Sequence, residues 1–128
     1  MPRKISLVCV SGTHEKLQMA AMFASVAAAS GDDVSVFLSM NAVLPFVKGR
    51  GEALDEGPFG ALLGTKGVPP YRDLFQMAAE IGGARIQPCS MALDLIKAEA
   101  GDLDPMLGPP TGLTKFLSDA EGAQVFTF

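Results

Sequence analysis

Two cysteines and one histidine are the side chains of this 128-residue chain best suited to nucleophilic or proton-transfer chemistry. Cys89 follows a short apolar segment, ARIQP at 84 to 88, and opens a helical pattern, CSMALDLIKA. A thiol at the N-cap or in the first turn of a helix lies among unpaired backbone N–H groups, which favour the thiolate. We therefore predict that any chemistry centres on Cys89. The alternative is that Cys89 is a small buried hydrophobe, as free cysteines commonly are.

The other two side chains have more limited roles. Cys9 lies inside the apolar run KISLVCV, so we predict that it belongs to the core. His14 begins the helix after that run. If the strand before Cys89 lies beside the first strand, His14 could pair with Cys89 and assist proton transfer. Otherwise His14 is a solvated histidine in the first turn of its helix.

Strand and helix patterns alternate along the chain and must position these residues. The apolar, mostly β-branched runs predict strands at 4 to 10, 34 to 39, 84 to 88 and 124 to 128. Helical patterns cover 14 to 30, 71 to 81, 89 to 98 and 111 to 123, with a short helical stretch up to about Lys48. Apolar strands without polar alternation predict an α/β fold with a mostly parallel sheet covered on both faces. We expect four strands in one domain spanning 1 to 128, with room for a short fifth in the loops.

Glycines and small side chains refine this prediction. Gly31 and Gly82-Gly83 are expected to end their helices. The first helix has a face of small residues that would let it approach the sheet closely: Leu17, Ala20, Ala21, Ala24, Ala27 and Ala28. Four methionines fall at helical positions that we assign to the core: Met19, Met22, Met77 and Met91. The segment 49 to 70 holds six glycines and three prolines, as expected for a lid, an oligomer contact or a mobile loop.

The carboxyl ends of parallel strands share one edge, where such folds bind and react. Three loops are expected there: 11 to 14, the segment from Met40, and 89 to 91. The candidate residues around Cys89 are therefore Ser11, Gly12, Thr13, His14, Met40, Ser90 and Met91.

Composition disfavours several functions. The net charge of -4, with ten scattered basic residues, disfavours nucleic-acid binding. The longest uncharged stretch, from Leu17 to Gly31, is shorter than the roughly 20 residues of a membrane-spanning helix. The N-terminus lacks the pattern of a signal peptide, so we expect a cytoplasmic protein with reduced thiols. No phosphate-loop, dinucleotide or zinc-ligand spacing is present, and we expect no cofactor and no metal.

Several strings in order resemble the DsrE/DsrF-like family of sulfur-relay proteins, sometimes described as peroxiredoxin-like. They are SGTHEKLQ at 11 to 18, VSVFLSM at 34 to 40, KGVPPYRDLFQMAAEIGGARI at 66 to 86, PCSMALDLI at 88 to 96 and FLSDAEGAQVFTF at 116 to 128. The resemblance implies a Rossmann-like three-layer α/β/α domain that forms homo-oligomers. It also implies a cysteine persulfide at Cys89 that receives sulfur from a donor protein and passes it to an acceptor protein.

One departure affects the choice of chemistry. Some relatives carry a second cysteine near the segment after Cys89, whereas residues 90 to 128 contain none. An intramolecular resolving thiol is therefore not expected, which favours a one-cysteine sulfur carrier over a self-contained redox cycle. Two alternatives remain: a non-catalytic binding or scaffold subunit of an oligomer, and a thiol-dependent peroxide reductase.

Overall fold

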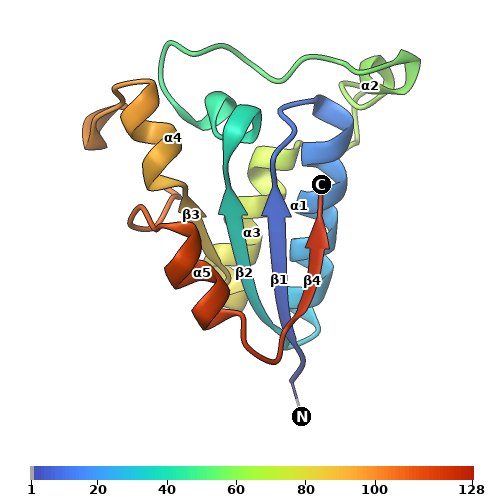
Figure 1. Ribbon diagram of the computed structural model, residues 1–128. Coiled ribbons are helices and arrows are strands. Elements are labelled where there is room, and N and C mark those ends of the chain that lie inside the picture. The colour runs from blue at the N-terminus through green and yellow to red at the C-terminus, as the bar shows by residue number, and fades with distance from the viewer. Residues whose placement is uncertain (1) are drawn as a thin grey trace.

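The computed structural model describes residues 2–128, and its centre is a four-stranded sheet in which every neighbouring pair is parallel (Figure 1). The strands are β1 (Lys4–Cys9), β2 (Asp33–Leu38), β3 (Arg85–Pro88) and β4 (Gln124–Thr127), in the spatial order β3-β2-β1-β4. The first two strands are central and are almost entirely buried, as their continuous apolar sequences require. The predicted α/β fold with a parallel sheet is confirmed.

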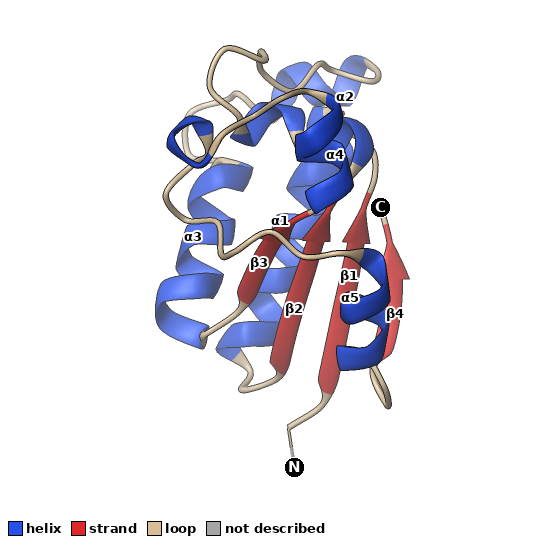
Figure 2. Ribbon diagram, turned by 60° about the vertical axis from the view of Figure 1, so that its left-hand side comes forward, coloured by secondary structure: helices blue, strands red, loops and turns tan. Residues whose placement is uncertain are grey.

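Helices cover both faces of the sheet, so the protein has three layers (Figure 2). The helix α1 (His14–Ala29) and the helix α3 (Tyr71–Gly82) pack against each other on one face. On the other face, α5 (Leu113–Asp119) places Phe116 against Phe37 of β2, with 4.9 Å between ring centroids. Two short helices, α2 (Pro58–Leu62) and α4 (Ser90–Leu95), lie at the end of the sheet where the strands finish.

The small-residue face of α1 is buried as predicted. Leu17, Ala20, Ala21 and Ala24 are completely inaccessible to solvent, and Ala28 faces the end of α3. A Cβ atom on Gly82 would lie 2.3 Å from the Ala28 Cβ atom and 3.1 Å from the Ala28 backbone. The two helices can therefore approach this closely only because Gly82 has no side chain.

Some local boundaries differ from those that the sequence predicts. The helix α4 ends at Leu95 because Lys97, at φ 54°, has the left-handed backbone that a helix cannot contain. The stretch after β2 consists of two single 3₁₀ turns, Met40–Ala42 and Leu44–Phe46. A third 3₁₀ turn, Ala100–Asp102, lies in the loop before α5. In contrast, Gly31 and Gly83 adopt the left-handed conformation expected after α1 and α3.

The assignment of four methionines to the core was wrong. The exposed fractions of Met19, Met22, Met77 and Met91 are 53%, 45%, 47% and 49%. Met19 and Met22 lie at positions of the helical period next to the alanine face of α1. The alanines pack closely against the sheet, which leaves no space there for the methionine side chains. Met19 and Met22 are therefore displaced to the flanks of α1, and Met77 and Met91 lie on the exposed sides of α3 and α4.

The two edges of the sheet differ in whether another segment of the chain covers them. Along the outer side of β3, the Gly108 N–H donates to the Ile86 carbonyl at 2.7 Å and the Thr111 N–H donates to the Pro88 carbonyl at 3.0 Å. Segment 108–111 thus covers this edge, although it forms only an isolated bridge at Thr111 rather than a fifth strand. No strand of the described residues lies beyond β4. Among residues 2–128, no helix is long and apolar enough to cross a membrane.

The contact between α1 and α3 leads to a stability prediction. Gly82→Ala should destabilise the protein by about 1–3 kcal/mol, because the added methyl overlaps Ala28 in a closely packed interface. Gly101→Ala is the matched control, since its Cβ would meet no atom within 4 Å. Urea unfolding followed by circular dichroism measures both variants. An unchanged or higher stability for Gly82→Ala, the usual effect of alanine in a helix, would contradict the packing argument.

Candidate functional site

Cys89 lies at the carboxyl end of β3 and is the N-cap residue of α4, as predicted from its position. Its backbone is extended, with φ -72° and ψ 121°, and its side chain makes no capping hydrogen bond. The Cys89 N–H donates to the Leu38 carbonyl at 2.8 Å, and the Cys89 carbonyl accepts from the Leu93 N–H at 3.1 Å. These bonds hold the backbone between β2 and α4, and the side chain of Cys89 belongs to the buried core.

The Cys89 residue is only 4% exposed. Thr111, which is itself buried, lies beside it in an isolated parallel bridge, and its carbonyl accepts the Ser90 N–H at 3.0 Å. The segment 108–111 therefore flanks Cys89 as well as covering β3. A reactant can reach the sulfur only if residues that cover it move.

Cys9 has the core position predicted for it. It is fully inaccessible, and burial raises the pKa of its thiol to about 12, so it stays protonated at neutral pH. Cys9 pairs with Leu38 across β1 and β2, while Cys89 bonds to Leu38 from the other side. Two strand spacings place the two Cα atoms on the order of 9 to 10 Å apart, beyond the reach of a disulfide. Both cysteines are free, and Cys9 is not placed to resolve an oxidised Cys89.

The condition for pairing His14 with Cys89 is not met, because β2 lies between β1 and β3. Instead the His14 Nδ1 atom is 3.1 Å from the Asp55 Oδ1 atom, and the imidazole ring packs edge-on against Tyr71 with 5.8 Å between centroids. His14 thus holds the loop after residue 50 rather than the thiol.

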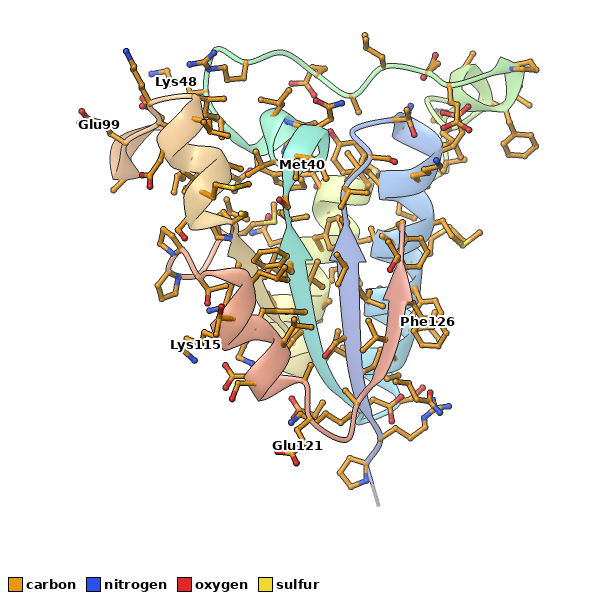
Figure 3. All side chains as sticks on the ribbon, in the orientation of Figure 1. Met40, Lys48, Glu99, Lys115, Glu121 and Phe126 are labelled. Atoms are coloured by element: carbon orange, nitrogen blue, oxygen red, sulfur yellow. The ribbon has the colours of Figure 1, made fainter. Side chains whose placement is uncertain are left out.

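The loops after β1 and β2 do meet. A Cβ atom on Gly12 would lie 2.3 Å from the Asn41 carbonyl oxygen, so only glycine permits this contact between Ser11-Gly12-Thr13 and the turn that follows β2. In that turn Met40 has φ 51°, which is strained for a side chain of this size, and is exposed above the carboxyl end of β2 (Figure 3). Met40 therefore lies in the loop beside the Cys89 loop, whereas Ser11 and Thr13 lie one loop farther away.

The remaining candidates lie at the start of α4. Ser90 is half-buried, and its N–H is used by Thr111. Met91 is exposed on the outer side of the helix. Both flank Cys89, but the side chain of Met91 is the one that a partner could contact without any movement of the fold.

Sequence reasoning missed a strap, residues 52–57, that crosses the same end of the sheet and is fastened to α1. The Glu15 carboxylate accepts the N–H groups of Glu56 and Gly57 at 2.8 and 2.7 Å, and the His14 N–H donates to the Leu54 carbonyl at 2.9 Å. The N–H groups donated by the strap hold the pKa of Glu15 below its usual range. An acidic residue in the first turn of α1 was the only local sequence signal.

A cavity of about 730 Å³ opens near the other end of this loop, between residues 45–52 and residues 101–105. Arg72 of α3 lies at its wall, where its guanidinium donates to the Pro45 carbonyl and its Nε atom is 3.3 Å from the Asp104 carboxylate. It also stacks on the Phe46 ring at 5.7 Å. Cys89 does not line this cavity, so the cavity is distinct from the thiol site.

Neither the known protein-family models nor the curated proteins include a match to the sequence. Among solved structures, the chain is similar to the protein of unknown function MTH1491 from Methanobacterium thermoautotrophicum, with a TM-score of 0.66 at 11% identity over 98% of this chain and 99% of that one. It is also similar to the YchN protein of E. coli, with a TM-score of 0.63 at 15% identity over the whole of both chains. At these identities the comparisons establish a shared Rossmann-like α/β fold and nothing about activity.

The strap attachment predicts a pH-dependent local opening. Because the pKa of Glu15 is lowered by folding, its contribution is fully present above the ordinary pKa of a glutamate and is lost as the pH falls through the lower folded value. Glu15→Ala should therefore increase amide hydrogen exchange at Glu56 and Gly57 at neutral pH. In this variant the protection of the two amides should no longer decrease as the pH falls through the pKa of Glu15. Glu80→Ala, which removes an exposed carboxylate from α3, should leave these amides unchanged. Equal exchange in the wild type and Glu15→Ala would contradict the role of Glu15.

Proposed function

We propose that this protein accepts sulfane sulfur as a persulfide on Cys89 and passes it to an acceptor thiol. The observation that carries the proposal is the placement of Cys89 at the carboxyl end of β3 as the N-cap of α4, with its sulfur free of any capping bond. The resemblance of the PCSMALDLI segment to the DsrE/DsrF-like family supports the same interpretation.

The proposed chemistry needs only one thiol. The Cys89 thiolate attacks the outer sulfur of a donor persulfide, so that a new S–S bond forms at Cys89 while the donor S–S bond breaks and the donor leaves as a thiolate. An acceptor thiolate then attacks the outer sulfur and Cys89 leaves as the thiolate. One S–S bond replaces another at each step, and no oxidant or reductant is consumed.

The absence of a nearby second thiol favours this transfer over a peroxide cycle. Oxidation of Cys89 by peroxide would produce a sulfenic acid that needs another thiol to resolve it. Cys9 is separated from Cys89 by the whole of β2 and remains protonated, with a pKa of about 12. A relay, in contrast, takes its second thiol from the partner protein.

Burial of Cys89 sets the order of events in this mechanism. Because the residue is only 4% exposed, a donor must first loosen the contact between α4 and segment 108–111. The backbone bonds of Thr111 at this contact are few, namely those that join it to Pro88 and to Ser90. Docking of the donor protein beside the exposed Met91 would bring it to this contact, and the buried persulfide would then be protected from water and stray thiols.

The test is the intact mass of the folded protein after incubation with glutathione persulfide. We expect the wild type to gain one sulfur atom, about 32 Da, that is removed by a reducing thiol. Cys89→Ser should show no gain, whereas the matched Cys9→Ser variant should gain as much as the wild type. An adduct missing from the wild type, or present equally in Cys89→Ser, would contradict the proposal and favour a non-catalytic subunit. Consumption of hydrogen peroxide with a sulfenic acid at Cys89 would instead favour a peroxide reductase.

A further inference from the structure

The outer edge of β4 is an uncovered strand edge. The Phe128 N–H donates to the Val8 carbonyl and the Phe128 carbonyl accepts the Val10 N–H, both at 2.8 Å, so this residue directs its backbone groups toward β1. Backbone direction alternates along a strand. The N–H and C=O groups of Val125 and Thr127 therefore point away from β1, where the described chain has no strand to receive them.

Apart from its short length of four residues, this edge lacks the features that normally keep an edge strand from pairing. Proteins protect such edges with charges, proline, bulges or a covering segment. The strand β4, QVFT, has no charge and no proline, and Val125 is 50% exposed. At the opposite edge the chain covers β3 with its own segment 108–111. The described residues therefore leave β4 open to a pairing strand.

An apolar groove continues from the edge onto α1. A cavity of about 370 Å³ lies between β4 and the exposed side of the helix (Figure 3 labels Phe126 at this edge). Its apolar lining includes Met19, Met22, Phe23, Val26 and Phe126, and Val26 is 67% exposed. The Phe23 and Phe126 rings pack 4.6 Å apart at its base. The misassigned methionines of α1 thus belong to a continuous apolar surface.

We propose that this surface, β4 with the outer side of α1, pairs with the same surface of a second copy of the chain through an antiparallel β4–β4 contact. A two-fold axis at Phe126 would place Val125 opposite the partner's Thr127 and Thr127 opposite the partner's Val125. Both residues direct their free groups outward, so each such pair can exchange two hydrogen bonds, about four in all. The edge strand is therefore complementary to itself.

The same axis also brings apolar side chains of the two copies together. Residues opposite each other in an antiparallel pair point to the same face. Phe126 would meet its own counterpart on the α1 side of the sheet, and the groove of each copy would be closed by the other's helix. A lipid surface or a small apolar ligand could fill the groove but could not satisfy the outward N–H groups of β4.

Charge does not oppose this arrangement. No charged residue lies between Lys16 and Asp32 along the sequence of α1. At the rims of the surface, Arg3 is paired with Asp32 at 2.7 Å and Lys16 is 3.6 Å from Glu56. Two copies would therefore bring together an uncharged surface bordered by cations that already have partners. The pairing is independent of any chemistry at Cys89.

Light scattering coupled to size-exclusion chromatography tests the proposal across roughly 1 to 100 μM protein. We expect an even number of chains in the wild type and half the molar mass, or less, in both Val125→Pro and Met22→Glu. Val125→Pro removes an outward N–H that β1 does not use, and circular dichroism verifies that each variant is folded. The matched control Ile81→Glu changes a 78% exposed apolar residue on α3 and should keep the wild-type mass. A monomeric wild type, an odd-numbered assembly, or folded variants with the wild-type mass would overturn the proposal.

Disulfide trapping tests the register. In a chain with Cys9→Ser and Cys89→Ser, Phe126→Cys should give a covalent dimer under mild oxidation, because opposed residues at the axis have Cα atoms about 4.5 Å apart. Gln124→Cys should give none, since its copies would be roughly 14 Å apart along the strands. If Phe126→Cys unfolds the chain, Val125→Pro and Met22→Glu still decide the question. Equal trapping at both positions would overturn the proposed axis.

Discussion

The close approach of α1 to the sheet and to α3 is the constraint on which most of the structure depends. A parallel sheet of short strands must be covered on both faces, and here one of these covers is a helix whose inner face is almost entirely alanine. Small side chains bring the helix backbone near the strands, and Gly82 lets α3 close against Ala28. The core is therefore thin on this side, and Leu17 and Gln18 are the only α1 side chains longer than alanine that are buried in it.

This constraint accounts for the surface of α1. Leu17, Gln18 and the alanines take the inner face, so Met19, Met22 and Val26 are displaced to the outside although they are apolar. Because β4 is the edge strand beside this helix, the displaced side chains form one surface with Phe126. The thin core and the apolar groove are thus two results of the same packing.

The parallel arrangement also determines which chemistry the carboxyl edge can hold. All four strands end on the same side, but the order β3-β2-β1-β4 places the Cys89 loop beside the Met40 turn and away from the His14 loop. His14 and Glu15 instead fasten the strap, and Arg72 joins the strap region to the loop at Asp104. Cys89 is left without a second thiol or an imidazole, which is why a transfer between proteins suits it better than a cycle completed within one subunit.

Local patterns in the sequence specify the elements and several of their ends. Continuous apolar runs define buried strands, the alanine periodicity defines the inner face of α1, and Gly31 and Gly83 supply the left-handed residues that end helices. These are local signals, because a backbone conformation and the spacing of apolar residues depend on near neighbours. The position of Cys89 after a strand and at a helix start, and the burial of Cys9, follow from the same signals.

Only the tertiary structure decided which elements are neighbours. Strand order separates His14 from Cys89, and the packing distance of α1 decides that its methionines are exposed. The burial of Cys89 beside Thr111 and the attachment of Glu15 to the strap join residues that are more than 20 positions apart in the chain. No local pattern encodes such contacts, because they depend on how whole helices and strands fit together around one core.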